Sequence, residues 1–169
     1  MTERTIVLVR HAKAARPDGV DDFNRALTPR GHADSGAVGA WLAHRGYAPD
    51  VVICSPARRT RQTWHGVALG MADAGSTASP DVRYEPPVYD GDEDDLLTAV
   101  RGAPASASTV LLVGHNPPVS TLSALLDPEA DTDAEGLRTA GIAVHHFAGD
   151  WASLAAGSAA LLESHTARG

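Results

Sequence analysis

Residues 5–11 read Thr-Ile-Val-Leu-Val-Arg-His, a run of β-branched and apolar residues that ends in two polar side chains. The run does not alternate with polar residues, which is typical of a strand buried on both faces of a parallel sheet. Asp50–Cys54 and Thr109–Val113 are runs of the same kind, and Val82–Glu85 is a fourth strand candidate. These four segments therefore predict a sheet with a parallel centre.

Helical patterns separate the predicted strands. One begins at Thr28-Pro29, where Thr28 is expected to cap the helix and Pro29 to take its first position, and Gly46 can end it. Two more are expected to begin at Ser55-Pro56, with Ser55 as the cap, and at Asn116-Pro117. A short fourth helix is expected at Glu93–Arg101. Strands that alternate with helices in this way are typical of an α/β fold.

The pattern changes beyond Gly141. Ile142–Phe147 and Trp151–Ala155 flank the turn residues Gly149-Asp150, and Ala159–Ser164 follows, so we expect hairpin-like strands at one edge of the sheet. The whole chain, residues 1–169, is therefore predicted to be a single domain. Its expected fold class is α/β, a three-layer α/β/α arrangement in which the central sheet is mostly parallel and has antiparallel edge strands.

The composition limits where such a domain can act. The 169 residues are 43% hydrophobic and 21% charged, and 14 basic against 21 acidic residues give a net charge of -7. An acidic chain of this kind is a poor partner for nucleic acid or an anionic membrane. No apolar run approaches the roughly 20 residues of a membrane helix, and Met1–Arg4 lacks the pattern of a signal peptide. We therefore expect a cytoplasmic protein that binds neither nucleic acid nor membrane.

Polar residues follow three of the predicted strands at the point where each strand ends. Arg10-His11 follows the first, Ser55 and an arginine-rich helix start follow the second, and Gly114-His115-Asn116 follows the fourth. Ligands of open parallel sheets bind beyond these carboxyl ends. Arginines and a helix N-terminus suit a phosphate group, and an imidazole can attack its phosphorus atom. The sequence therefore predicts a phosphate site with a nucleophilic histidine.

Other kinds of site are less well supported by the residues. His11, His115, His145 and His146 lack the spacing of metal ligands, and neighbouring arginines would repel a cation, so we expect no metal. Ser55 lacks the Gly-x-Ser-x-Gly elbow of a serine nucleophile. Neither a Walker loop nor a Gly-x-Gly-x-x-Gly motif is present. The acidic residues 90–95 are expected to form a solvated loop and helix start.

Three short motifs occur together and resemble those of one family. Val9-Arg10-His11-Ala12 resembles the Arg-His-Gly signature of the histidine phosphatase superfamily, also called the phosphoglycerate mutase-like family. Residues 55–63 resemble its Ser-x-x-x-Arg-x-x-x-Thr segment, and residues 113–117 resemble its second-histidine segment. The spacing, with Leu27-Thr28-Pro29-Arg30-Gly31, looks most like the small SixA-type phosphohistidine phosphatases. The resemblance extends from about residue 5 to residue 126, with a weaker continuation through residue 162.

The resemblance implies a role for each matching residue. It implies that His11 is the nucleophile, that Arg10 and Arg59 clamp the phosphate, and that His115 is the second histidine of the pocket. Asn116, beside His115, is expected to contribute to phosphate binding. The helical spacing places Arg58 and Arg61 on a different face from Arg59, and the family match selects Arg59. The family needs neither metal nor cofactor, so none is expected here.

Two departures from the family pattern affect the expected activity. Ala12 stands where the family has glycine, which a backbone with negative φ tolerates. No general acid is clearly placed, and the nearest carboxylates are Glu85 and those in 90–95. We therefore expect a metal-independent phosphatase that hydrolyses protein phosphohistidine through a phosphohistidine intermediate. The alternatives are a phosphatase of a small phosphomonoester, with Glu85 or one of the carboxylates in 90–95 as the acid, and a non-catalytic phosphate-binding module.

Overall fold

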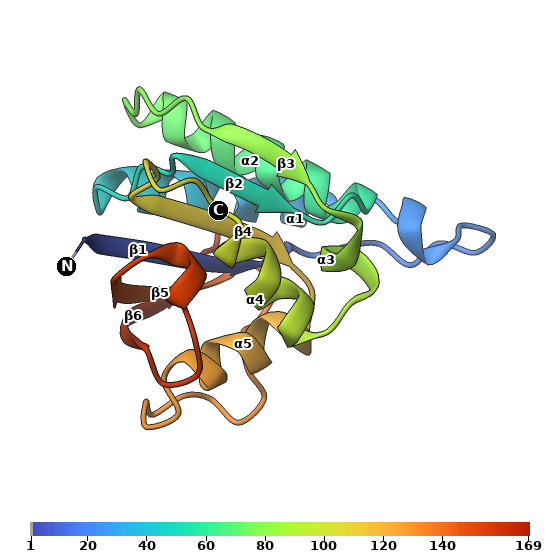
Figure 1. Ribbon diagram of the computed structural model, residues 1–169. Helices are drawn as coiled ribbons and strands as arrows, with labels where there is room; N and C mark the ends of the chain where they lie inside the picture. The colour runs from blue at the N-terminus through green and yellow to red at the C-terminus, as the bar shows by residue number, and fades with distance from the viewer. Residues whose placement is uncertain (1) are drawn as a thin grey trace.

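The computed structural model describes residues 2–169, which form a six-stranded mixed sheet (Figure 1). Strands follow one another across the sheet in the order β3-β2-β4-β1-β5-β6. The pairs among the first four strands in that order are parallel, whereas β5 pairs antiparallel with β1 and with β6. The predicted α/β class with antiparallel edge strands is therefore confirmed. The strands are β1 (Glu3–Arg10), β2 (Val51–Cys54), β3 (Asp81–Tyr84), β4 (Thr109–Gly114), β5 (Gly141–Ala148) and β6 (Ala159–Thr166).

Helices cover both faces of the sheet. The helices α1 and α2 lie on one face, and α4 and α5 lie on the other (Figure 1). None of the helices within residues 2–169 is long and apolar enough to cross a membrane. The helices are α1 (Pro29–His44), α2 (Arg58–Asp73), α3 (Pro86–Asp90), α4 (Glu93–Arg101) and α5 (Pro118–Leu126), with two 3₁₀ turns, η1 (Asp22–Asn24) and η2 (Trp151–Ser153).

Strand β1 divides its side chains between two hydrophobic cores. Ile6 and Leu8 point into the core beneath α4 and α5, and Val7 and Val9 point into the core beneath α1 and α2. All four are at most 1% exposed, and burying each such side chain contributes about 1.5–3 kcal/mol. This burial explains the unbroken apolar run of the sequence. It also fixes the residues that follow β1 at the middle of the sheet.

Helix α2 lies unusually close to α1 because glycines face each other across the contact. A Cβ atom added to Gly39 would collide with the carbonyl oxygen of Val67, and one added to Gly70 would collide with that of Gly36. The two helices can therefore approach backbone to backbone only with glycine at these positions. The contact fixes the position of α2, whose first turn carries Arg59.

The helix boundaries confirm part of the sequence analysis. Thr28 accepts a hydrogen bond from the Gly31 N–H (3.0 Å) at the start of α1, and Gly46 follows its end with a φ of 78°. Helix α4 covers Glu93–Arg101 as predicted, and the Asp92 and Asp95 carboxylates form a capping box at its start. Both carboxylates are exposed, in agreement with a solvated helix start.

Three predicted boundaries are wrong. Helix α2 begins at Arg58 with Ala57 as its N-cap, so Ser55 does not cap it; its hydroxyl instead lies against a histidine of the site described below. Helix α5 begins at Pro118 rather than at Asn116-Pro117. The strand expected at Trp151–Ala155 is the 3₁₀ turn η2, because the Trp151 ring is buried in the core and its Nε1–H donates to the Ala107 carbonyl (2.9 Å).

Candidate active site

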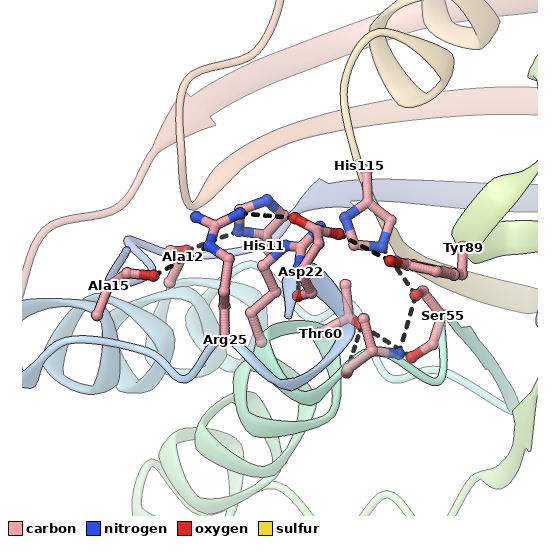
Figure 2. Close-up of polar contacts among 11 residues, drawn as sticks. His11, Ala12, Ala15, Asp22, Arg25, Ser55, Thr60, Tyr89 and His115 are labelled. Carbon is pink, nitrogen blue, oxygen red and sulfur yellow. Dashed lines mark hydrogen bonds and ion pairs between the residues drawn. The ribbon is translucent and has the colours of Figure 1, made fainter. Parts of the chain in front are cut away.

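The sheet brings the three polar strand ends to one place. Arg10 pairs with Gly114 across β1 and β4, and Cys54 pairs with Val113 across β2 and β4, so His11, Ser55 and His115 follow at nearly the same level. The His11 and His115 ring centroids are 5.3 Å apart (Figure 2). The two residues are only 8% and 9% exposed, respectively. The predicted histidine pair therefore comes together at the carboxyl edge of the sheet.

Hydrogen bonding selects the tautomer of His11. Its Nδ1 lies 2.7 Å from the Ala12 carbonyl oxygen, and a carbonyl can only accept, so Nδ1 carries the proton and Nε2 keeps its lone pair. Burial lowers the pKa of His11 to about 4, and the positive charges of Arg59 and Arg10 add to this effect. The ring is therefore neutral at pH 7, in the form that a nucleophile requires.

Ala12 occupies the position of the family's glycine without backbone strain. Among the described residues, Ala140 is the only non-glycine with a positive φ, so Ala12 does not need glycine's freedom. Its side chain is fully buried, and its N–H donates to the Thr63 hydroxyl of α2 (3.1 Å). The substitution of alanine for glycine is therefore compatible with the geometry of the site.

His115 is held by the serine that follows β2. Its Nε2 lies 2.8 Å from the Ser55 hydroxyl, which also accepts the Ala57 N–H (3.2 Å). The hydroxyl can then donate its own proton to Nε2, which leaves the ring proton of the neutral His115 on Nδ1. Burial, with the proximity of His11, lowers the pKa of His115 to about 3. Thus Nδ1 becomes a hydrogen-bond donor inside the site.

The two predicted clamp arginines lie beside the histidines and are anchored by backbone carbonyls. Arg10 donates from Nη1 to the Leu137 carbonyl (3.1 Å), and Arg59 donates from Nη1 to the Asp22 carbonyl (2.7 Å). Arg59 is 6% exposed. In contrast, Arg58 is exposed and Arg61 is engaged locally with the Pro56 carbonyl. Of the three arginines near the start of α2, Arg59 is therefore the one that contacts this site.

Three buried nitrogens of the site have no hydrogen-bond partner. Within residues 2–169, Arg10 Nε, Arg59 Nε and His115 Nδ1 are the only buried side-chain nitrogen or oxygen atoms that lack one. Leaving a buried donor unsatisfied costs about 1–3 kcal/mol. Three such donors around His11 indicate that a ligand with several acceptor oxygens completes the site, and a phosphoryl group has this chemistry.

A carboxylate that the sequence analysis missed lies beside Arg59. Asp22 of η1 accepts hydrogen bonds from the Tyr89 hydroxyl (2.8 Å) and Arg25 Nη1 (3.0 Å) (Figure 2). It also accepts one from Arg59 Nη2 (3.1 Å). The bonds from Tyr89, Arg25 and Arg59 hold the pKa of Asp22 well below its usual range. Asp22 is therefore ionised and cannot donate a proton at neutral pH. The neighbouring Asp22 carboxylate in turn raises the pKa of Tyr89.

Aromatic side chains stand beside the same carboxylate. The Tyr89 ring meets the His115 ring edge to face, with centroids 5.6 Å apart, and Phe23 packs on Tyr89 in the same way at 5.1 Å. No local sequence pattern marks Asp22, Phe23 or Tyr89, because the first two lie in a short 3₁₀ turn and the third in a five-residue helix.

The remaining predicted site residues are placed less directly. Asn116 lies beside Arg10, since its amide donates to the same Leu137 carbonyl (2.8 Å), and its side-chain oxygen accepts from Ser120. Glu85 is the N-cap of α3, and its carboxylate makes no hydrogen bond with any described residue of the site. Residues 2–169 contain no group of three or more His, Cys, Asp or Glu side chains placed to hold a metal ion.

Comparisons with known proteins agree with this geometry. Residues 6–79 match the family described as the histidine phosphatase superfamily, branch 1. A candidate phosphohistidine phosphatase SixA from Nakamurella multipartitia is 37% identical, with a TM-score of 0.82 over 99% of this chain and 98% of that one. A second candidate SixA, from Agrobacterium tumefaciens, is 26% identical, with a TM-score of 0.75 over 96% and 97% of the two chains. An uncharacterized protein of Mycobacterium tuberculosis is 37% identical over 167 residues, 95% of this chain and 100% of the relative.

Proposed function

Because this chain belongs to branch 1 of the histidine phosphatase superfamily, we propose that it hydrolyses phosphohistidine on proteins through a covalent intermediate on His11. The observation that carries the proposal is the set of three buried, unpartnered donors at Arg10, Arg59 and His115. They surround a neutral imidazole whose Nε2 lone pair is free. Donors for the phosphoryl oxygens and a nucleophile for the phosphorus atom thus occupy one site.

In the first step, the phosphoryl group enters with its oxygens on Arg10 Nε, Arg59 Nε and His115 Nδ1. The Nε2 lone pair of His11 forms a bond to phosphorus, and the bond to the leaving group breaks with its electron pair staying on that group. The His11 ring then carries a positive charge, which the Nδ1–H bond to the Ala12 carbonyl stabilises. As in other phosphoryl transfers, catalysis consists mostly of positioning and charge neutralisation.

In the second step, water attacks the phosphorus atom of phospho-His11. The N–P bond breaks, its electron pair returns to Nε2, and the proton lost by the water stays on the phosphate product. The same donors hold the phosphoryl oxygens throughout, so the enzyme does not have to rearrange between the two steps. His11 ends the cycle in its original tautomer.

The carboxylates near the site favour phosphohistidine over a small phosphomonoester. When the leaving group is an alkoxide, a general acid that protonates it increases the rate by about 10²–10⁴-fold. A phosphohistidine ring that is already protonated leaves as neutral imidazole and does not need this acid. The Glu85 carboxylate makes no hydrogen bond with either histidine, and Asp92 and Asp95 are engaged in capping α4. Asp22 is ionised. None of these carboxylates is suited to protonate an alkoxide.

The test is to trap the phosphoenzyme. A radiolabelled phosphohistidine peptide is mixed with the enzyme, the reaction is stopped in denaturing alkali, which preserves N–P bonds, and the labelled residue is identified. We expect label on His11 and none in the His11→Ala variant. His32→Ala, which removes an exposed histidine on α1, should label like the wild type. Label that persists in His11→Ala, or that is found on Ser55, would contradict the proposal.

A further inference from the structure

Asp22 is an unexpected group in a site that binds phosphate. An ionised carboxylate repels a phosphoryl dianion, yet Asp22 contacts one of the phosphate clamps directly, through Arg59 Nη2. Hydrogen bonds from two further side chains also keep the Asp22 carboxylate ionised. Arg25, itself fixed by a bond from Nε to the Ala15 carbonyl (3.0 Å), donates to one carboxylate oxygen, and Tyr89 donates to the other.

Orientation of Arg59 accounts for part of this arrangement. Both Nη atoms of Arg59 donate to Asp22, one to its backbone carbonyl and one to its carboxylate. The Nε edge of the guanidinium is therefore the one left for the phosphoryl group, and it is the edge without a partner. A neutral side-chain oxygen at position 22 could accept the same bond from Arg59, although more weakly, so orientation alone does not require the negative charge.

The carboxylate retains capacity to accept one more hydrogen bond. A carboxylate offers about four acceptor positions, and here Oδ2 accepts from Tyr89 and Arg59, whereas Oδ1 accepts from Arg25 alone. The Asp22 side chain is 53% exposed, so a molecule arriving from solvent can reach the carboxylate. The Tyr89 ring stands beside it, in edge contact with His115.

We propose that Asp22 is a specificity-determining residue that accepts a hydrogen bond from a cationic N–H on the leaving group of the substrate. This inference rests on the proposed phosphatase function and assigns to Asp22 the preference for phosphoramidates, whose phosphoryl group is bonded to nitrogen, over phosphate esters. The ring of protonated phosphohistidine is such a group, because one nitrogen carries phosphorus and the other carries a proton. A phosphate ester has no N–H at this place.

The hydrogen bond from the substrate ring takes the place of a general acid. When His11 Nε2 bonds to phosphorus, the substrate's N–P bond breaks and its electron pair stays on the substrate nitrogen. The ring leaves as neutral imidazole and keeps the N–H that Asp22 accepts. Asp22 favours the protonated ring before the step, so no proton has to be delivered during it.

The test compares two substrates in the full-length protein: a short peptide that contains phosphohistidine, and p-nitrophenyl phosphate, an ester without an N–H. Asp22→Asn keeps the shape of the side chain and removes its charge. Both kcat/KM values should fall, because Arg59 loses part of its anchor. The ratio of the peptide value to the ester value should fall by a further factor of about 10–100, the range expected for a hydrogen bond to a charged group.

Two further variants separate the local effect from a general change of charge or fold. Asp21→Asn makes the same change in charge one residue earlier, where the carboxylate accepts only from the Asn24 side chain, and should leave the ratio unchanged. Tyr89→Phe removes one donor to Asp22 and leaves the charge, so it should lower the ratio less than Asp22→Asn does.

The outcomes distinguish this inference from the proposed function. If Asp22→Asn lowers both values equally, Asp22 only orients Arg59 and the inference is wrong, while the phosphatase function stands. If the ratio rises, Asp22 obstructs the leaving group and the inference is again overturned. If the wild-type protein hydrolyses the ester but not the peptide, the proposed substrate itself is wrong. The two wild-type kcat/KM values are enough to show this, and no variant is needed.

Discussion

Replacing Arg59 with alanine is the most direct test of the phosphate clamp. Arg59 is 6% exposed, is anchored through both Nη atoms to Asp22, and leaves a buried Nε free for the phosphoryl group. A hydrogen bond to a charged group contributes about 1.5–3 kcal/mol. Loss of this one bond to the transition state would cost about 1.5–3 kcal/mol, which is a factor of about 10–10² in kcat/KM.

The assay is kcat/KM for p-nitrophenyl phosphate at pH 7, with the melting temperature measured in parallel to show that the variant folds. Arg61→Ala and Arg58→Ala are the controls, because Arg61 bonds only to the Pro56 carbonyl and Arg58 is exposed. Both should stay within about 3-fold of the wild type, as expected for residues outside the site. The kcat/KM of Arg59→Lys should lie between those of the wild type and Arg59→Ala, since lysine keeps the charge but not the planar guanidinium.

Two results would refute the reasoning. A folded Arg59→Ala variant that retains more than about a fifth of wild-type kcat/KM would show that the guanidinium contributes less than one ordinary hydrogen bond. A loss in Arg61→Ala or Arg58→Ala as large as that in Arg59→Ala would show that the start of α2, rather than the one buried arginine, carries the effect.

Three further predictions concern ligand binding and pH. Tungstate, a phosphate analogue, should stabilise the wild type by about 2.7 kcal/mol at 100 times its Kd, which is measured as a rise in melting temperature. The rise should be much smaller for His115→Ala; equal rises would place the anion elsewhere. After correction for ionisation of the substrate, kcat/KM should not change between pH 8 and 5 through titration of His11. It should fall below about pH 4, where His11 Nε2 becomes protonated. A fall in kcat/KM centred near pH 6.5 would contradict the burial of the ring. The folded-state pKa of His11 lies below the unfolded value of 6.5, so the unfolded chain binds more protons between pH 6.5 and about 4. The contribution of His11 to the free energy of unfolding should therefore decrease by about 3 kcal/mol as the pH falls through that window. Denaturant titrations should show a shallower decrease for His11→Asn, and identical slopes would argue against the shift.

The fold was predictable wherever burial alone decides the structure. The runs in β1, β2 and β4 are apolar throughout because both faces of those strands are covered, and the sequence shows this directly. The segment at Trp151–Ala155 was not predictable in this way. Its residues suit a strand, but the pocket that receives the Trp151 ring is formed by residues distant in the chain, which favours a 3₁₀ turn.

The residues of the candidate site also differ in whether the sequence alone could predict them. His11 and His115 could be found because a histidine directly after a buried strand has a known place at the edge of the sheet. Asp22, Arg25 and Tyr89 could not, because they lie in loops and short turns and meet only through the tertiary fold. The same holds for Ser55, whose position before a proline suggested a helix cap although its hydroxyl bonds to His115.

The central place of β1 has a consequence for biosynthesis. This strand leaves the ribosome well before β4 and β5, which are its two neighbours in the sheet. About 100 residues separate β1 from β4, and at roughly 5–20 residues per second their translation takes about 5–20 s. During that time Ile6–Val9 has no neighbouring strand in the sheet, and an unpaired apolar strand of this kind is prone to aggregate. A nascent chain that stops short of β5 carries His11 but lacks one of the two strands that pair with β1.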